Sequence, residues 1–113
     1  MDENSKKTAL RETLQSLRTP GELYVIMSGA TNLPFVVCNP ETFDDEILLY
    51  HREEDAKNKA KELTEAHYLA GVAKLVDDQL LAFYTSLYLM GVNGLSVNVG
   101  TDQEKRVQLK DLV

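Results

Sequence analysis

The most apolar stretch of the chain lies in its last third, between Asp77 and Gly100. Its large apolar residues are Leu80, Leu81, Phe83, Tyr84, Leu87, Tyr88, Leu89 and Met90. Because they surround a helix on almost every side, we expect that helix to be largely buried. Gly91 predicts a left-handed helix end, and Gly94 predicts a second tight bend. Leu95 to Val99 alternates as a strand that the helix packs beside.

A second helix is predicted from Glu53 to His67. Its inward positions recur at helical spacing, at Ala56, Ala60, Leu63 and His67. The pattern is amphipathic, and the two small alanines let the helix lie close to a sheet. Acidic residues in the first turn suit the positive end of the helix dipole. Asp77 or Asp78 is expected to cap the later apolar helix.

A narrower stripe predicts a helix over residues 5–18, after residues 1–4, which we expect to be frayed. Leu10, Leu14 and Leu17 recur at helical spacing on an otherwise polar helix. The segment Thr19-Pro20-Gly21 ends it, because proline disfavours helix in the residue before it. The leucine stripe fits two arrangements: it docks on its own domain, or it pairs with a second copy of the chain.

The remaining apolar runs predict strands. The runs are Leu23–Met27, Pro34–Cys38, Glu46–Tyr50, Tyr68–Val76, Leu95–Val99 and a short one at Arg106–Leu109, followed by a polar end. The first two strands are interpreted as a hairpin with a longer connection. Interspersed helices and strands without a glycine-rich nucleotide loop favour an α+β fold. We therefore expect residues 1–113 to form a single α+β domain, with a mixed five- to six-stranded sheet and helices packed on it.

The charge and composition narrow the classes of partner. The formal net charge is -6, from 18 acidic and 12 basic residues. This balance argues against nucleic acid as a partner, because such binding rests on a basic surface. No segment approaches the ~20 apolar residues that span a bilayer, so no membrane contact is expected. The polar start of the chain and the single cysteine, Cys38, favour a cytoplasmic, reducing compartment.

The reactive residue types do not form a catalytic set. His51 and His67 lack a metal-ligand neighbour at helical spacing, so both are interpreted as structural or exposed. Cys38 lies in an apolar run, which favours a buried, inert thiol over a nucleophile. Asp44, Asp45 and Glu46 lack the donor pattern of a calcium loop and are interpreted as a solvated turn. We therefore expect no catalytic residues, no metal and no cofactor.

Four residues are weak candidates for a ligand site. Tyr84 and Tyr88 lie one turn apart on the apolar helix, and Asn93 and Asn98 lie in the glycine-containing turns after it. Buried tyrosine hydroxyls need hydrogen-bond partners, and asparagine tolerates left-handed turns. A core role for the tyrosines and a backbone role for the asparagines are the favoured interpretations, while a pocket stays open as an alternative.

Three stretches resemble a known family. They are LYVIMSGATNLPFVV, EILLYHREEDAKNKAKEL and FYTSLYLMGVNGLSVNVG. They are similar to the N-terminal domain of the SseB-like family of bacterial proteins, in the early Leu23-Tyr24-Val25 strand, in the helix that begins Glu53-Glu54-Asp55-Ala56, and in the late strand Leu95 to Gly100. The resemblance covers about residues 22 to 100. It implies a bacterial cytosolic α+β domain without catalysis, and it carries over no functional residues.

The leading hypothesis is a bacterial cytosolic, non-catalytic protein-interaction module that self-associates, with a homodimer through Leu10, Leu14 and Leu17 as one form. The identity of any other protein partner is not predicted. The alternative is a small-molecule-binding regulatory domain that uses Tyr84, Tyr88, Asn93 and Asn98. A third hypothesis is an inhibitor encoded by a mobile element and working through its acidic surface.

Overall fold

The computed structural model describes residues 3–18 and 21–113, with side chains from Lys6 onward. Its elements are α1 (Glu3–Arg18), β1 (Tyr24–Ser28), β2 (Val36–Cys38), β3 (Asp45–Tyr50), α2 (Glu53–Glu65), β4 (Ala70–Lys74), η1 (Asp77–Gln79), α3 (Leu80–Leu89), β5 (Gly94–Val97), β6 (Lys105–Gln108) and η2 (Leu109–Asp111). This is the predicted α+β fold. Met1 and Asp2, expected to be frayed, lie outside the described residues, and so do Thr19 and Pro20. The backbone of residues 3 and 4 is already helical.

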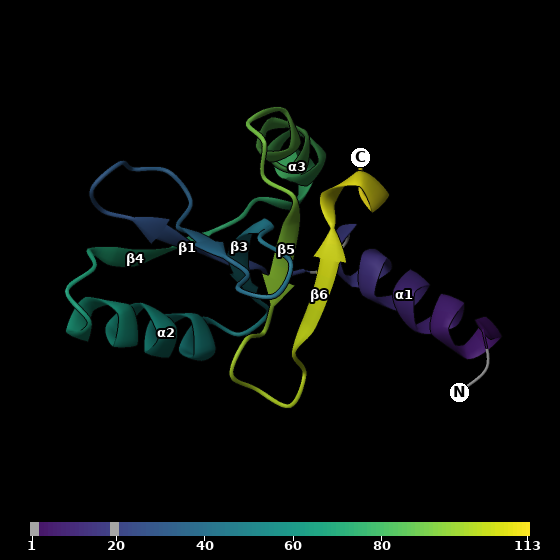
Figure 1. The fold of residues 1–113 in the computed structure, drawn as a ribbon, viewed down its shortest axis with the longest axis horizontal. Helices are drawn as coiled ribbons and strands as arrows, with labels where there is room; N and C mark the ends of the chain where they lie inside the picture. Colours follow the sequence, from purple (N-terminus) through teal and green to yellow (C-terminus); the bar gives the residue numbers. More distant parts are fainter. Residues whose placement is uncertain (1–2, 19–20) are drawn as a thin grey trace.

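The six strands of the described chain form one mixed sheet in the order β4-β1-β3-β5-β6, and β2 also pairs with β3. β3 and β5 run parallel, with Ile47 beside Leu95. The other strand pairs are antiparallel. Figure 1 shows α2 on one side of this sheet, α3 on the other, and α1 reaching out beside β6.

The predicted hairpin of the first two strands is confirmed only in part. β1 is joined to the segment just before β2 by one antiparallel bridge, between Met27 and Pro34, and the Phe35 amide donates to the Ile26 carbonyl. β2 itself pairs with β3, from Val36 beside Ile47 to Cys38 beside Asp45. The physical reason is the turn at Asn39, whose side-chain oxygen accepts hydrogen bonds from the Glu41 and Thr42 amides. Such a side-chain-closed turn forms locally and brings β2 back along β3.

Two helix boundaries also differ from the sequence prediction. α2 ends at Glu65, and His67 beyond it is exposed with a φ of 72°, so His67 does not continue the inward stripe. Asp77 and Asp78 form the short turn η1, and the residue that caps α3 is Gln79, without a side-chain cap bond. A 3-10 turn at the start of the helix satisfies some of the backbone hydrogen-bonding groups of the first turn, so an aspartate cap is not required.

The two glycines after α3 have different roles. Gly91 has a φ of 94°, the left-handed conformation that the sequence predicts for the end of this helix. Gly94 is not in a tight bend but opens β5, where a Cβ atom would lie 2.9 Å from the Val107 carbonyl oxygen. The close approach of β6 therefore explains the glycine at this position.

Two hydrophobic cores cover the two faces of the sheet. The first, under α3, consists of Leu17, Leu23, Val25, Ile47, Leu49, Leu80, Tyr84, Leu87, Val92, Leu95, Val97, Val107, Leu109 and Leu112. The second, under α2, consists of Tyr24, Ile26, Leu48, Tyr50, Ala56 and Ala60. The prediction of a polar chain end after Leu109 is wrong for Leu112, which joins Leu109 in the first core.

Candidate functional site

The apolar helix α3 is buried along one side only. Leu80, Tyr84 and Leu87 face the first core. The other sides are open: Leu89 is 79% exposed, Leu81 64%, Met90 60% and Tyr88 48%. The expectation that this helix is largely buried is therefore wrong. The reason is the architecture: each sheet face carries one layer, and in Figure 1 no other element lies beyond α3.

Exposed apolar residues of α3 lie along one stripe, before and after the half-buried Thr85. Residues three, four and seven apart on a helix lie on the same face, so Leu81, Thr85 and Tyr88 are neighbours. Ala82 and Leu89 border them on one side. We call these five residues, Leu81, Ala82, Thr85, Tyr88 and Leu89, the α3 outer face. Met90 lies on the flank of the helix, between this face and the core.

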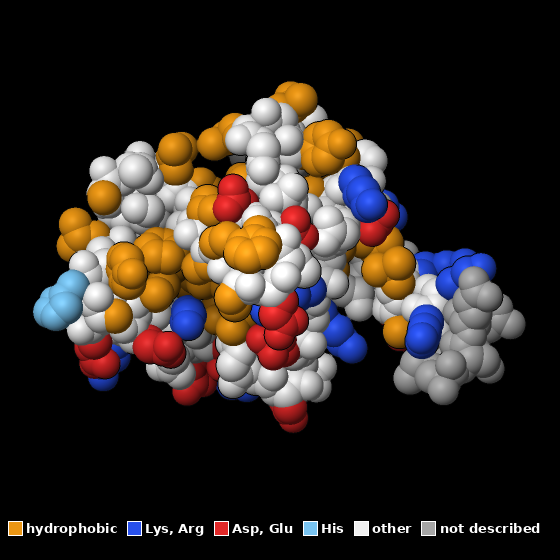
Figure 2. All heavy atoms as spheres, in the orientation of Figure 1, with side chains coloured by type: hydrophobic (Ala, Val, Ile, Leu, Met, Phe, Trp, Pro, Cys, Tyr) orange, Lys and Arg blue, Asp and Glu red, His pale blue; other side chains and the backbone are white. Residues whose placement is uncertain are grey.

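No charge interrupts the α3 outer face. The sequence holds no Asp, Glu, Lys or Arg between Asp78 and Asp102. In Figure 2 hydrophobic side chains lie over α3 at the top of the view and also at its left and centre, whereas acidic side chains lie mainly at the bottom, below α2 and the β5–β6 connection. A chain of net charge -6 thus presents an apolar surface without charged side chains on the described residues of α3.

The buried side holds α3 in a fixed position. The Tyr84 hydroxyl donates a hydrogen bond to the Leu17 carbonyl at 2.7 Å and so joins α3 to the end of α1. Burial raises the pKa of the Tyr84 phenol. The side chains of Leu80 and Leu87 fill the core one turn to either side. The outer face is therefore presented by a rigid element, which lowers the entropy cost of binding.

Two shallow hollows flank α3. One, of about 480 Å³, lies toward the end of β4 and is lined by Leu75, Val76, Phe83 and Ser86 among others. The other, of about 320 Å³, lies toward the loop between β1 and β2 and is lined by Leu33, Phe35, Val36, Leu87 and Met90 among others. Both are mainly apolar, so they extend the apolar surface beyond the helix itself.

The leucine stripe of α1 is divided between core and solvent. Leu17 is fully buried in the first core, and Leu14 packs against it. Leu10, one turn earlier, is exposed. Of the two arrangements that the sequence leaves open, docking on the chain's own domain describes Leu14 and Leu17, and Leu10 remains available to a partner.

The four candidate ligand residues do not converge on one cavity. Tyr84 is buried and bonded to α1, whereas Tyr88 points away on the outer face. Asn93 and Asn98 lie just before and just after β5, at opposite ends of that strand. The Asn93 side-chain oxygen accepts a hydrogen bond from the Asp45 amide at 2.9 Å. Asn98 adopts a left-handed backbone with a φ of 56°, so it serves its turn as expected.

Asn98 also orients His51. Its side-chain oxygen accepts from the His51 amide at 3.0 Å, and its side-chain nitrogen lies 3.1 Å from His51 Nδ1. With Nδ1 as acceptor, the ring proton belongs on Nε2, which lies 3.4 Å from the Ser16 carbonyl oxygen. This arrangement ties α1 to the sheet and borders two hollows of about 300 and 390 Å³. His51 is thus structural, as predicted.

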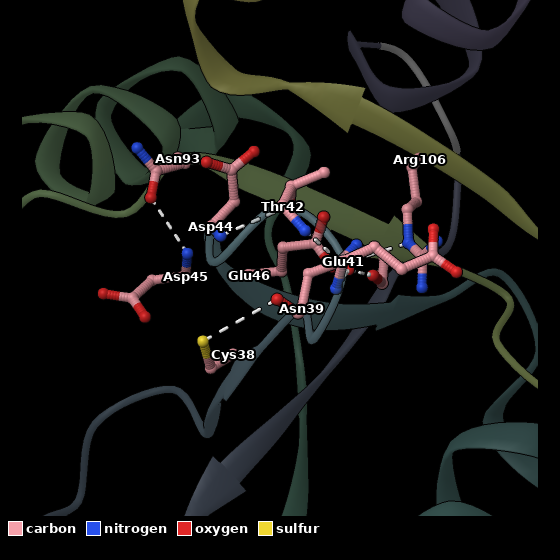
Figure 3. A network of polar contacts seen from close by, with 10 residues as sticks. Cys38, Asn39, Glu41, Thr42, Asp44, Asp45, Glu46, Asn93 and Arg106 are labelled. Carbon is pink, nitrogen blue, oxygen red and sulfur yellow. Dashed lines mark hydrogen bonds and ion pairs between the residues drawn. The ribbon is translucent and has the colours of Figure 1, made fainter.

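The expectation that Cys38 is buried is wrong. β2 is short and only its middle residue, Val37, turns inward, so the Cys38 side chain is exposed. Its sulfur lies 3.8 Å from the Asn39 carbonyl oxygen. Figure 3 shows Cys38 beside the acidic turn, on the side away from Arg106.

Glu46 is a buried carboxylate at the end of the acidic turn. It accepts a hydrogen bond from the Ser96 hydroxyl at 2.9 Å, and the Arg106 Nε atom lies 3.5 Å from the same oxygen. Figure 3 shows Arg106 reaching it from β6. The interpretation of residues 44–46 as a solvated turn therefore fails for Glu46, which is paired and lies in the sheet. The sequence signal for its place in the sheet is the predicted strand Glu46–Tyr50, which corresponds to β3.

Within the described residues, no group of three or more His, Cys, Asp and Glu side chains is placed to hold a metal ion. No helix in that part of the chain is both long and apolar enough to cross a bilayer. No protein-family model matches the chain, and no curated protein matches it. The resemblance to the SseB-like family stays a prediction.

Proposed function

We propose that this protein is a non-catalytic protein-interaction module that binds a second copy of itself through the α3 outer face. The observation that carries the proposal is the exposure of a charge-free row of large apolar side chains on a rigid helix. Exposing such a row to water is unfavourable, since full burial of each large apolar side chain contributes about 1.5–3 kcal/mol of favourable free energy. A bacterial cytosolic setting, as the family resemblance implies, fits this role.

The charge pattern favours a second copy as the partner. Two molecules that each carry a net charge of -6 repel over most of their surfaces. The α3 outer face itself carries no charged side chain, so two copies meet there with little opposition of like charges; the charges of Lys110 and Asp111 lie beside it on η2, which contacts α3. Leu10 on α1 is a second exposed apolar residue that such an assembly can cover.

The test is the molar mass in solution, measured by light scattering over a wide concentration range. We expect the wild-type mass to rise toward that of a dimer, and Leu89→Glu to remain a monomer. Phe43→Glu is the matched control, because Phe43 is also 79% exposed but lies in the β2–β3 turn. A wild-type monomer at high concentration, or equal loss in both variants, contradicts the proposal.

A second candidate function is a small-molecule-binding regulatory domain. The apolar hollow of about 320 Å³ beside Met90 favours it, because its volume falls in the range of ligand sites. A ligand that binds only the folded state raises the melting temperature. A thermal-shift screen of apolar metabolites is expected to give such a rise in the wild type and a smaller one in Met90→Lys. No rise with any compound counts against this candidate.

A further inference from the structure

We infer that two copies pair through α3 in an antiparallel arrangement whose two-fold axis passes beside Thr85. The inference rests on the proposed function and adds the arrangement of the contact. Three features of the α3 outer face carry it: the order of its side chains, the area that they expose and the absence of charge.

The order of side chains is complementary to itself when one helix is reversed. Thr85 lies at the centre of the outer face, with Leu81 and Ala82 one turn before it and Tyr88 and Leu89 one turn after it. A two-fold axis beside Thr85 sets Leu81 of one copy next to Tyr88 of the other. It also sets Ala82 next to Leu89 of the other copy, a small residue against a large one. The small residues at the centre let the two helices approach to the usual 8–10 Å.

The exposed area suits the centre of a small dimer interface. A large apolar side chain presents on the order of 150–200 Å² when fully exposed. The exposed fractions of Leu81, Tyr88 and Leu89 then give an apolar area on the order of 300–400 Å². A standard interface buries about 800 Å² on each partner, so these side chains supply somewhat less than half of it.

Charge and dipoles also favour the antiparallel pairing. Parallel helices would place both pairs of aspartates, Asp77 and Asp78, at the same end of the contact. The antiparallel arrangement separates them by the length of α3, about 15 Å for ten residues. The antiparallel arrangement also points the two helix dipoles in opposite directions, which is electrostatically favourable.

Disulfide trapping tests this arrangement. In a Cys38→Ser background, which removes the exposed native thiol, Thr85→Cys brings two thiols together at the axis. We expect rapid oxidation to a covalent dimer on mild oxidant. Ser86→Cys is the matched control, since it is adjacent on the same helix and exposed but turned away from the axis. Equal trapping of both variants, or no trapping of Thr85→Cys in a protein that light scattering shows to be dimeric, overturns the arrangement and leaves self-association standing.

A charge-pair experiment gives a second, independent readout. Leu89→Lys and Ala82→Glu are each expected to weaken self-association by at least about tenfold. Mixed together, they are expected to restore a heterodimer, because one contact then pairs Glu with Lys and the other keeps the native residues. Ser86→Glu mixed with Leu89→Lys is the control and should not restore it. Recovery in both mixtures, or in neither, contradicts the two-fold register. A wild type that is monomeric in light scattering contradicts the proposed function itself.

Discussion

The helices α2 and α3 cover opposite faces of one sheet, yet the sides that they expose to solvent differ in polarity. α2 turns Ala56 and Ala60 inward and keeps its other sides charged. α3 turns Leu80, Tyr84 and Leu87 inward and keeps its outer face apolar. Both bury one stripe, so the buried stripe alone does not distinguish them. The difference teaches that the residues beyond the buried stripe carry the functional information, because the fold does not require them to be apolar.

The largest difference in stability is expected between substitutions on the two sides of α3 itself. Leu87→Ala removes a buried side chain and is expected to lower the free energy of unfolding by about 2–5 kcal/mol. Leu89→Ala, two residues later, is expected to change it by less than about 0.5 kcal/mol. Urea denaturation of both variants, at a concentration where they are monomeric, measures the difference. A large loss in Leu89→Ala would mean that the outer side is packed within the monomer.

The same comparison can be made between the helices by adding volume. Ala60→Leu places a large side chain between α2 and the sheet and is expected to cost about 1–3 kcal/mol of stability. Ala82→Leu adds the same volume to the exposed side of α3 and is expected to be nearly neutral. Thermal unfolding, converted to free energy, ranks the two. Equal costs would contradict the close approach of α2 to the sheet.

Periodicity predicted α2 and its inward alanines because one stripe of α2 is apolar and the rest is charged. It could not predict which side of α3 is buried, because Leu80 and Leu81 are equally apolar. Tertiary packing decides between them. The sequence offered one signal: α3 contains more apolar stripes than a single layer on a sheet can cover. The burial of Glu46 likewise depends on a contact with Ser96, which lies far away in sequence.

A hydrogen bond distinguishes the two tyrosines of α3. Tyr84→Phe removes the donor to the Leu17 carbonyl, and the expected loss of stability is about 1–2 kcal/mol because that carbonyl remains buried. Tyr88→Phe removes an exposed hydroxyl and is expected to change little. Chemical denaturation measures both, and hydrogen exchange in α1 should rise in Tyr84→Phe alone. Equal effects would show that the bond does not hold α1 to α3.

Tyr50 is buried on one face of the sheet and Tyr84 on the other, which predicts a shared response to alkali. Burial raises the pKa of Tyr50 to about 12, and burial likewise raises the pKa of Tyr84. The unfolded value is near 10, so the fold favours the neutral phenol. This contribution to stability is full below pH 10 and is lost as the pH rises toward 12. Urea midpoints from pH 8 to 11 should therefore fall, and fall less in Tyr50→Phe. An unchanged slope in that variant would contradict the assignment to Tyr50.

The smallest effect is expected for a charged pair on the solvent-facing side of α2. The corresponding side of α3 is its apolar outer face. Glu62 pairs with Lys59 one turn earlier at 3.2 Å. Glu62→Gln should lower the stability by only about 0.2–0.5 kcal/mol, and 1 M salt should remove most of the difference. Glu65→Gln is the control, because a negative charge in the last turn opposes the helix dipole, so its stability should hold or rise slightly. Neither variant should change the molar mass in solution, whereas Leu89→Glu should. If Glu62→Gln changed the association, the contact site would have to lie on α2 and not on α3, because the Glu62 charge would then be at the interface.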